Sequence, residues 1–374
     1  MSLFRRGDRG PAVAVIRARL ASLGLLAGGP GDVADAAFDE ACDSAVREFQ
    51  QRRGLKVDGM VGSETYRALD EARWQLGDRV LHYQVSRPYV GDDVVALQIR
   101  LLDLGFDVGR SDGIFGPRTD EAVREFQRNR GLTPDGTFGP VTHRAMEQLR
   151  RAVVGGRPGH LREHEQLHQS GRTLAGKYVC VDPGHGGDDP GVVAHGLREC
   201  DVVFDLASRL EGRLTAAGAV AIPTRSADGN PSEVDRTAMA NEAAVDLYLS
   251  LQAEGTQSES CQGIATYYFG DGDSRSSALG ERLADLVRHE ITARTDLLDG
   301  RSHPKTWELL RLTRMPAVQI GIGYLTNPAD AARLGQPTFL DILAEAILRA
   351  VQRLYLLPEE DPGSGQLQLP ALTH

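Results

Sequence analysis

An internal repeat fills the first 150 residues and constrains the fold of this chain more than any other feature. The run Ala45-Val-Arg-Glu-Phe-Gln50 recurs as Ala122-Val-Arg-Glu-Phe-Gln127, 77 residues further on, and Asp58-Gly59 matches Asp135-Gly136 at the same spacing. Apolar residues at helical spacing precede each run, for example Val13, Ile16 and Leu20 in the first copy. Each copy therefore predicts three short helices, which gives two small all-α modules at residues 1–75 and 85–150.

The second half alternates between strand and helix patterns, which predicts an α/β domain over residues 177–357. Its first buried strand, 178–181, runs into Asp182-Pro-Gly-His-Gly-Gly187, a loop at the carboxyl end of a strand, where α/β folds place their chemistry. Further strands are expected at 219–222, 247–250 and 316–322, and helices at 202–214, 236–241 and 340–354. The chain is thus multidomain, with a linker at 151–176 and a flexible, acidic C-terminal tail at 358–374.

Composition and charge exclude several classes of protein. The 374 residues carry a formal net charge of −10, which argues against a general nucleic-acid partner. No apolar run approaches about 18 residues, so no transmembrane segment is expected, and the first residues lack the apolar stretch of a signal peptide. The four cysteines form no CxxC pair, which fits reduced thiols. We therefore expect a cytoplasmic protein.

Three histidines in the linker have the spacing of one helix face. His160, His164 and His168 are four residues apart, and a His pair at this spacing can bind a metal ion. No carboxylate or cysteine completes a tight site, so the pattern favours a solvated linker helix.

The repeated module resembles the peptidoglycan-binding module of cell-wall hydrolases. That resemblance rests on a D-G-x-F-G loop before the A-V-x-x-F-Q helix, which the second copy has as Asp112-Gly-Ile-Phe-Gly116. The first copy has Asp35-Ala-Ala-Phe-Asp39 instead. The resemblance implies a glycan groove, better supported in the second copy, and docking to a protein is an equally open alternative.

The α/β half resembles the type-3, zinc-dependent N-acetylmuramoyl-L-alanine amidases. Asp182–Gly187 matches the first zinc motif, and Gly196-Leu-Arg-Glu199 supplies the second ligand at the family spacing. Thr224-Arg225, Arg236 and Asn241 follow in family order, as does Gly323-Tyr-Leu-Thr-Asn-Pro328. The resemblance implies a zinc held by His, Glu and His, with a Glu on a late strand as general base.

Two of these four groups are replaced in this chain. The third zinc motif reads Ser250-Leu-Gln-Ala253, so Gln252 stands at the ligand histidine, and Gly321 stands at the position of the catalytic Glu. His185, Glu199 and Gln252 then form a vestigial metal site, and no catalytic residue is assigned. His195, Glu254 and His303 are spare ligand candidates, and none of them is expected to be a base at the right place. We expect no cofactor, or zinc that binds weakly, and interpret the domain as a pseudoenzyme.

The order of modules resembles the actinobacterial CwlM-type proteins over nearly the whole chain. That resemblance implies a cytoplasmic regulator of peptidoglycan precursor synthesis, which stimulates the enolpyruvyl transferase MurA and is controlled by a Ser/Thr kinase. Ser364 and Thr373 are the candidate phosphorylation sites in the tail. Two alternatives stay open: an active zinc-dependent amidase of the autolysin or lysin kind, and a non-catalytic sensor of muropeptides or lipid-linked precursors.

Overall fold

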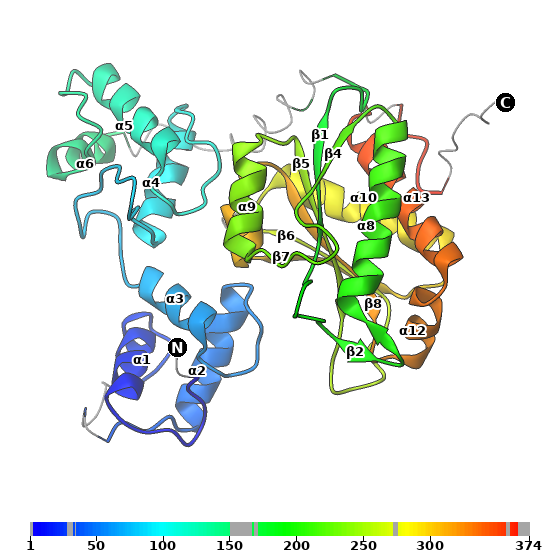
Figure 1. Ribbon diagram of the computed structural model, residues 1–374. Coiled ribbons are helices and arrows are strands. Elements are labelled where there is room, and N and C mark those ends of the chain that lie inside the picture. The colour runs from blue at the N-terminus through cyan, green and yellow to red at the C-terminus, as the bar shows by residue number, and fades with distance from the viewer. Residues whose placement is uncertain are drawn as a thin grey trace. The chain divides into compact units, whose positions relative to one another are not determined.

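The structure is a computed structural model that describes residues 3–27, 33, 35–149, 167, 171–271, 276–356 and 360–365. It divides into two compact units, Met1–Arg162 and Glu163–His374. Figure 1 shows the helices and strands of each unit.

The first unit holds the two repeated modules, each of which has three helices. These are α1 Pro11–Ser22, α2 Glu40–Arg52 and α3 Ser63–Glu71, then α4 Asp92–Asp103, α5 Pro117–Asn129 and α6 Pro140–Glu147. Each module buries its own apolar stripe, with Ile16 and Phe49 in one core and Leu97 and Phe126 in the other. The predicted all-α modules are confirmed.

The last residue of the repeated run fixes a loop in each module. Gln127 of α5 is buried, and its amide nitrogen donates to Asp135 Oδ1 at 2.8 Å while its oxygen accepts from the Gly136 N–H at 2.9 Å. Gln50 makes the equivalent contacts to Asp58 and Gly59. The repeat therefore ends in a glutamine because this residue satisfies the buried polar groups of the Asp-Gly loop.

The D-G-x-F-G loop is held by different chemistry in the two modules. In the second, Gln98 of α4 donates to Asp112 Oδ1 at 2.9 Å and accepts from the Gly113 N–H at 2.8 Å. In the first, Arg17 of α1 donates to the Ala37 carbonyl and pairs with Asp39, both at 2.9 Å. The altered loop of the first module is thus stabilised by an ion pair in place of a neutral amide.

The second unit is an α/β domain with a six-stranded mixed sheet in the order β4-β1-β5-β8-β6-β7. Its strands are β1 Tyr178–Pro183, β4 Val220–Pro223, β5 Leu247–Glu254, β6 Ile264–Phe269, β7 Asp299–Lys305 and β8 Ala317–Tyr324. Strands β4, β1, β5 and β8 are mutually parallel, whereas β6 runs antiparallel to β8 and parallel to β7. A short hairpin, β2 Val193–Ala194 and β3 Leu197–Arg198, lies outside this sheet.

Helices cover both faces of the sheet, as Figure 1 shows. They are α8 Glu199–Ala216, α9 Glu233–Glu242, α10 Ala278–Arg294, α11 Glu308–Leu312, α12 Pro328–Leu334 and α13 Pro337–Leu354. One core contains residues of α8, α10 and α13, and a second core on the other face contains residues of α9 and α11. The predicted α/β class is confirmed.

Strand alternation decides which side chains reach the second face. Leu249 and Leu251 of β5 lie in the core beneath α8 and α13, whereas Tyr248 lies in the core with α9. Ser250 and Gln252 follow Tyr248 at intervals of two, so they share the α9 face. By the same alternation, Gln319 and Gly321 of β8 project toward that face from the neighbouring strand.

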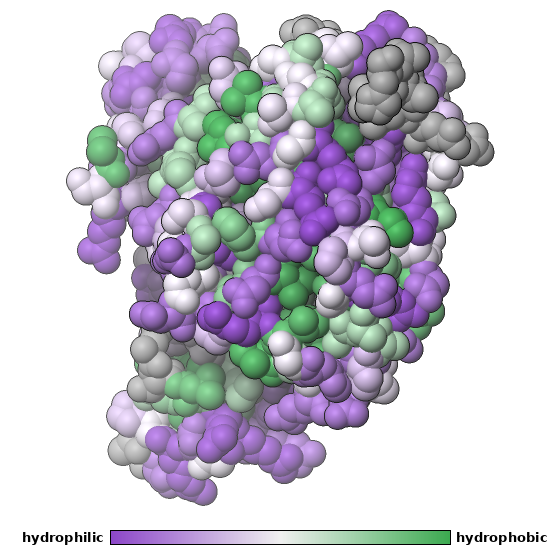
Figure 2. All heavy atoms as spheres, turned by 45° about the vertical axis from the view of Figure 1, so that its right-hand side comes forward, coloured by the Kyte–Doolittle hydropathy of each residue, from purple (hydrophilic) through white to green (hydrophobic). Residues whose placement is uncertain are grey.

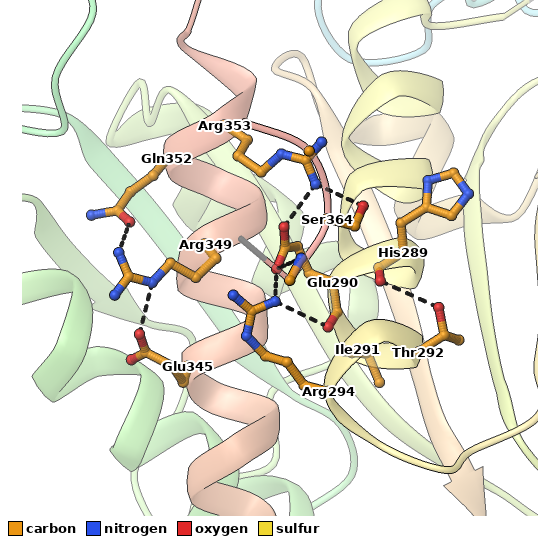
Figure 3. A network of polar contacts seen from close by, with 12 residues as sticks. His289, Glu290, Ile291, Thr292, Arg294, Glu345, Arg349, Gln352, Arg353 and Ser364 are labelled. Carbon is orange, nitrogen blue, oxygen red and sulfur yellow. Dashed lines mark hydrogen bonds and ion pairs between the residues drawn. The ribbon is translucent and has the colours of Figure 1, made fainter. Parts of the chain in front are cut away.

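Parts of the predicted linker and of the predicted C-terminal tail pack against the α/β domain. Leu167 and Leu174, inside the predicted linker, are apolar and are buried in the larger core of this domain. Two residues of the predicted flexible tail, Asp361 and Ser364, contact α13. Arg353 of α13 pairs with Asp361 at 2.7 Å and donates to Ser364 Oγ at 2.9 Å. Figure 3 shows Arg353 placed between Ser364 and Glu290 of α10. Residues 360–365 therefore have fixed contacts with the domain.

Hydrophobic residues reach the surface only in small groups between hydrophilic ones on the face drawn in Figure 2. Of the helices that the structure describes, none has the length and hydropathy needed to cross a membrane.

Candidate functional site

The site begins at a strained loop after β1. His185, Gly186 and Gly187 have φ values of 54°, 127° and 52°, so three successive residues adopt left-handed or related conformations. Such values suit glycine but are strained for histidine. The sequence Gly-His-Gly-Gly therefore bends sharply and presents the His185 ring to the cleft.

Two buried arginines hold this loop through its carbonyl groups. Arg225 donates to the carbonyls of Pro183 at 2.9 Å and Gly184 at 3.1 Å, and Arg236 of α9 donates to the His185 carbonyl at 2.7 Å. Both side chains are less than a tenth exposed. These motif residues act as scaffold, because their guanidinium groups satisfy carbonyls at the end of β1 and in the loop after it.

A buried ion pair ties the scaffold to the strand. Asp182 Oδ1 accepts from Thr224 Oγ1 at 2.5 Å and from Arg236 Nη1 at 2.8 Å. Asn241 serves a different loop, because it donates to the Leu312 carbonyl at 2.8 Å and accepts from the Arg314 N–H at 2.9 Å.

His185 and Glu199 are brought together as two ligands of one metal ion would be. His185 Nε2 lies 3.3 Å from Glu199 Oε2, and two donors on a tetrahedral zinc are about 3.3 Å apart. The other ring nitrogen, Nδ1, is 2.8 Å from Asp189 Oδ2. A carboxylate at this position orients a metal-binding histidine and fixes its tautomer. Asp189 is not among the residues predicted from the motifs, although its place four residues after His185 is a usable signal.

Burial and backbone contacts set the electrostatics of these groups. Glu199 is the first residue of α8, and its carboxylate accepts from the N–H groups of Val192 at 3.0 Å and Ala253 at 2.8 Å. Burial nevertheless raises the pKa of Glu199. The pKa of Asp189 is lowered, first by its hydrogen bond with His185 and then by the one from Gly191 N–H.

Gln252 lies in the same cleft, at the end of β5. Its amide lies against Gly184, where a Cβ on residue 184 would overlap it, and its nitrogen is 3.4 Å from Ser250 Oγ. The cleft has a volume of about 330 Å³. It is lined by His185, Asp189, Asn230, Arg236, Gln252 and Gln319, among others.

Gly321 lies beside Gln252 in the β5–β8 pairing, but its side of the sheet is not vacant. A Cβ at 321 would meet Glu254 Oε1 at 3.0 Å and Glu254 Cγ at 3.2 Å. Burial raises the pKa of Glu254, and the nearby Glu199 adds to that rise.

The donors present do not complete the zinc set that the amidase resemblance implies. Among the residues that the structure describes, no group of three or more His, Cys, Asp or Glu side chains is placed to hold a metal ion. His195 is exposed in the β2–β3 turn, and His303 Nε2 donates to the Gly300 carbonyl at 2.7 Å, so neither serves as a third ligand here. The amide of Gln252 is the remaining group, and it is a weak zinc ligand beside imidazole.

Other predicted residues lie elsewhere or outside the described part of the chain. Ser364 is half-buried, with its hydroxyl bonded to Arg353. Thr373 and the linker histidines 160, 164 and 168 lie outside the described residues.

Comparison with known proteins agrees with the class that this fold and site define. The N-acetylmuramoyl-L-alanine amidase family model matches residues 179–353, and a peptidoglycan binding domain model matches residues 9–69 and 90–146. The chain belongs to the N-acetylmuramoyl-L-alanine amidase family, with two peptidoglycan binding domains before the amidase domain.

Among its relatives is the N-acetylmuramoyl-L-alanine amidase CwlM of Mycobacterium tuberculosis, 47% identical over 97% of this chain and 92% of that protein. This similarity confirms the predicted resemblance to the CwlM type. The amidase LytC of Bacillus subtilis is 32% identical over 48% of this chain and 36% of its own length. The solved amidase AmiC2 of Nostoc punctiforme is 30% identical, covers 47% of this chain and 96% of its own, and has a TM-score of 0.44.

Proposed function

We propose that this chain is an inactive amidase scaffold that regulates peptidoglycan precursor synthesis. Gln252 carries the proposal. Catalytic zinc takes three protein ligands and a water, and a neutral amide at the third position lowers both the affinity for the metal and its capacity to activate water. His185 and Glu199 alone form an incomplete site.

The regulatory part of the proposal is supported by the similarity to the CwlM type over nearly the whole chain. We propose a cytoplasmic protein that stimulates the enolpyruvyl transferase MurA and responds to a Ser/Thr kinase. In that case the chain would act through a surface that binds another protein and not through a catalytic centre.

Metal analysis and an amidase assay on one purified sample test the first part. We expect substoichiometric zinc and no release of peptide from a muramoyl-peptide substrate, with or without added zinc. His185→Ala is the matched control, since it removes a metal-ligand candidate from the same cleft. Zinc-dependent turnover that His185→Ala abolishes would refute inactivity.

Reconstitution with purified MurA tests the second part. We expect the transferase rate to rise on adding the full chain, and to respond to kinase treatment of that chain. A rate that stays unchanged at saturating concentration would refute this role while leaving the test of inactivity intact.

The cleft favours a second candidate, a non-catalytic sensor of muropeptides or lipid-linked precursors. Asn230, Gln252 and Gln319 line about 330 Å³ with amide donors and acceptors that suit an N-acylated peptide. Calorimetry with a soluble muramoyl peptide tests this candidate. Gln319→Leu should weaken binding severalfold, whereas Val141→Ser, at an exposed position of the second module, should leave it unchanged.

A further inference from the structure

The second module contains a cavity between α4, α6 and the segment that follows α3. Its volume is about 540 Å³. Ala96 and Arg100 lie one turn apart on α4. His143 and Glu147 lie one turn apart on α6, so each helix turns one face toward the cavity. Among the residues that the structure describes, the lining consists of Gln75, Leu76, Ala96, Arg100, His143 and Glu147. The cavity is therefore separate from the D-G-x-F-G loop at 112–116, on which the resemblance to a glycan-binding module rests.

The Arg100 side chain brings a buried guanidinium nitrogen to this site. Its Nη2 is buried, and within the described part of the chain no group accepts a hydrogen bond from it. A guanidinium can only donate hydrogen bonds, so a buried N–H without an acceptor carries the full cost of losing its water. An oxygen atom of a ligand in the cavity would remove that cost.

In the first module the equivalent arginine is bound by a carboxylate. Arg19 of α1 precedes Arg100 by 81 residues, which is also the spacing between the first residues of α1 and α4. Arg19 Nη2 donates to Asp70 Oδ1 of α3 at 2.7 Å. The Arg19 Cζ lies 4.5 Å from the centre of the Tyr66 ring. A carboxylate and an aromatic ring therefore hold this guanidinium in the first module.

Both of these contacts are changed in the second module. His143 and Glu147 stand at the positions of the tyrosine and the aspartate, each 77 residues further on. The His143 ring packs against the segment after α3, where a Cβ on Gly77 would lie 2.7 Å from its Cε1. Among the described residues, neither an ion pair nor a ring contact joins Arg100 to another side chain. The repeat thus keeps the arginine and loses the carboxylate that would bind it.

We propose that Arg100 binds the carboxylate of a peptide ligand in this cavity, as Arg19 binds Asp70 in the first module. Charge-assisted arginine–carboxylate hydrogen bonds are strong and directional. Gln75 and Glu147 are exposed and supply acceptors for peptide N–H groups, so the lining suits a short peptide with a free carboxylate. The match to a peptidoglycan binding domain favours the peptide of a muramoyl peptide. This site belongs to the first unit, so it does not depend on the proposed inactivity of the amidase domain.

Tryptophan fluorescence of the full chain tests the site. Trp74 directly precedes the lining residue Gln75, and a Trp307→Phe background removes the only other tryptophan. The probes are a muramoyl dipeptide with a free terminal carboxylate and the same dipeptide with that group as an amide. We expect a saturable change with the carboxylate form and binding of the amide form weaker by about tenfold or more. No saturable change at millimolar concentrations of the carboxylate form, or equal affinity for the two forms, overturns the proposal.

Substitution of the arginine separates a specific contact from general attraction by positive charge. Arg100→Met keeps the aliphatic stem and should weaken binding of the carboxylate form by about tenfold or more. The matched control is Arg144→Met, which removes an exposed arginine of α6 that is not in the lining. This control should change the affinity by less than about twofold. Equal losses in the two variants would overturn the site.

Thermal unfolding without ligand distinguishes a binding arginine from a structural one. Arg100→Met should leave the melting temperature of the first unit unchanged or raise it, because a buried donor without an acceptor is removed. Arg19→Met should lower that temperature by about 2–4 °C, because it removes the hydrogen bond to Asp70. A fall after Arg100→Met as large as that after Arg19→Met would assign Arg100 a structural role and overturn the proposal.

Discussion

Removing Arg353 is expected to destabilise the α/β domain by about 3 kcal/mol. Glu290 of α10 has no exposed surface, and its Oε1 lies 2.7 Å from Arg353 Nη1 (Figure 3). Breaking a buried ion pair from one side costs about 3–5 kcal/mol, because a charge is left buried without its partner. Arg294 also pairs with Glu290 and remains in the variant, so we expect the lower end of that range.

Arg353→Met keeps much of the aliphatic stem and removes the guanidinium, so the loss reports on charge and hydrogen bonds. The matched control is Arg349→Met, one turn earlier on α13, because Arg349 pairs with the half-exposed Glu345 at 2.7 Å. Arg349 is itself buried, but Glu345 keeps 30% of its side chain exposed, so the carboxylate left behind stays partly hydrated and the control should cost about 1–2 kcal/mol.

Urea unfolding followed by tryptophan fluorescence measures both variants. The chain has two tryptophans, Trp74 and Trp307, so a Trp74→Phe background makes the signal specific to the α/β domain. A cost of about 3 kcal/mol corresponds to a fall of about 6–12 °C in melting temperature. If Arg353→Met and Arg349→Met differ by less than about 0.5 kcal/mol, burial of Glu290 does not set the cost and the reasoning is wrong.

Three further predictions concern the site loop and the modules. The pKa of Asp189 is lowered in the folded state. Its contribution to stability is therefore present above the unfolded pKa and is lost as pH falls through the folded pKa. The urea midpoints of the native chain and of Asp189→Asn should converge between about pH 5 and pH 2. Gly191→Ala should destabilise the α/β domain by about 1–3 kcal/mol in thermal unfolding, since φ is +64° and the new Cβ would lie 2.6 Å from a carboxylate oxygen. The control Gly212→Ala, in an open helical position, should stabilise the domain. A change of the same sign in both variants would contradict this account. Gln127→Leu should cost the first unit about 1–3 kcal/mol by leaving loop donors and acceptors unsatisfied, as measured by calorimetry, whereas the exposed Gln51→Leu should change little; equal effects would exclude the clamp.

Local pattern predicts the parts of this fold that short-range physics determines. The helices of both modules follow from apolar spacing, and the strands at 178, 247 and 317 follow from runs of buried residues. The sequence pattern predicts no element over the segment 264–305. Its strand β7 reads Asp-Gly-Arg-Ser-His-Pro-Lys, a polar edge strand whose pairing with β6 carries no hydrophobic signal.

In the candidate site, too, some features follow from the local sequence and others depend on strand pairing. The order of motifs predicts a cleft around His185 and Glu199, because both lie close to the ends of recognisable elements. The proximity of Glu254 to Gly321 depends on the pairing of β5 with β8 and on the register shift between Gln252 and Glu254, which no local pattern encodes. The sequence therefore shows that residue 321 has no side chain, but it does not show which side chain lies next to that position.

The two ways of holding the D-G-x-F-G loop have a consequence for binding. Gln98 and Arg17 keep their loops ordered without a ligand. Binding of a partner to either loop is therefore not opposed by the entropy that would be lost on ordering it. The second module's clamp is neutral and insensitive to salt. The Arg17–Asp39 pair of the first module leaves the aspartate about half exposed, so mobile ions screen it. Rising ionic strength should therefore loosen the first module's loop before the second, which makes ionic strength a means of separating the contributions of two otherwise similar domains.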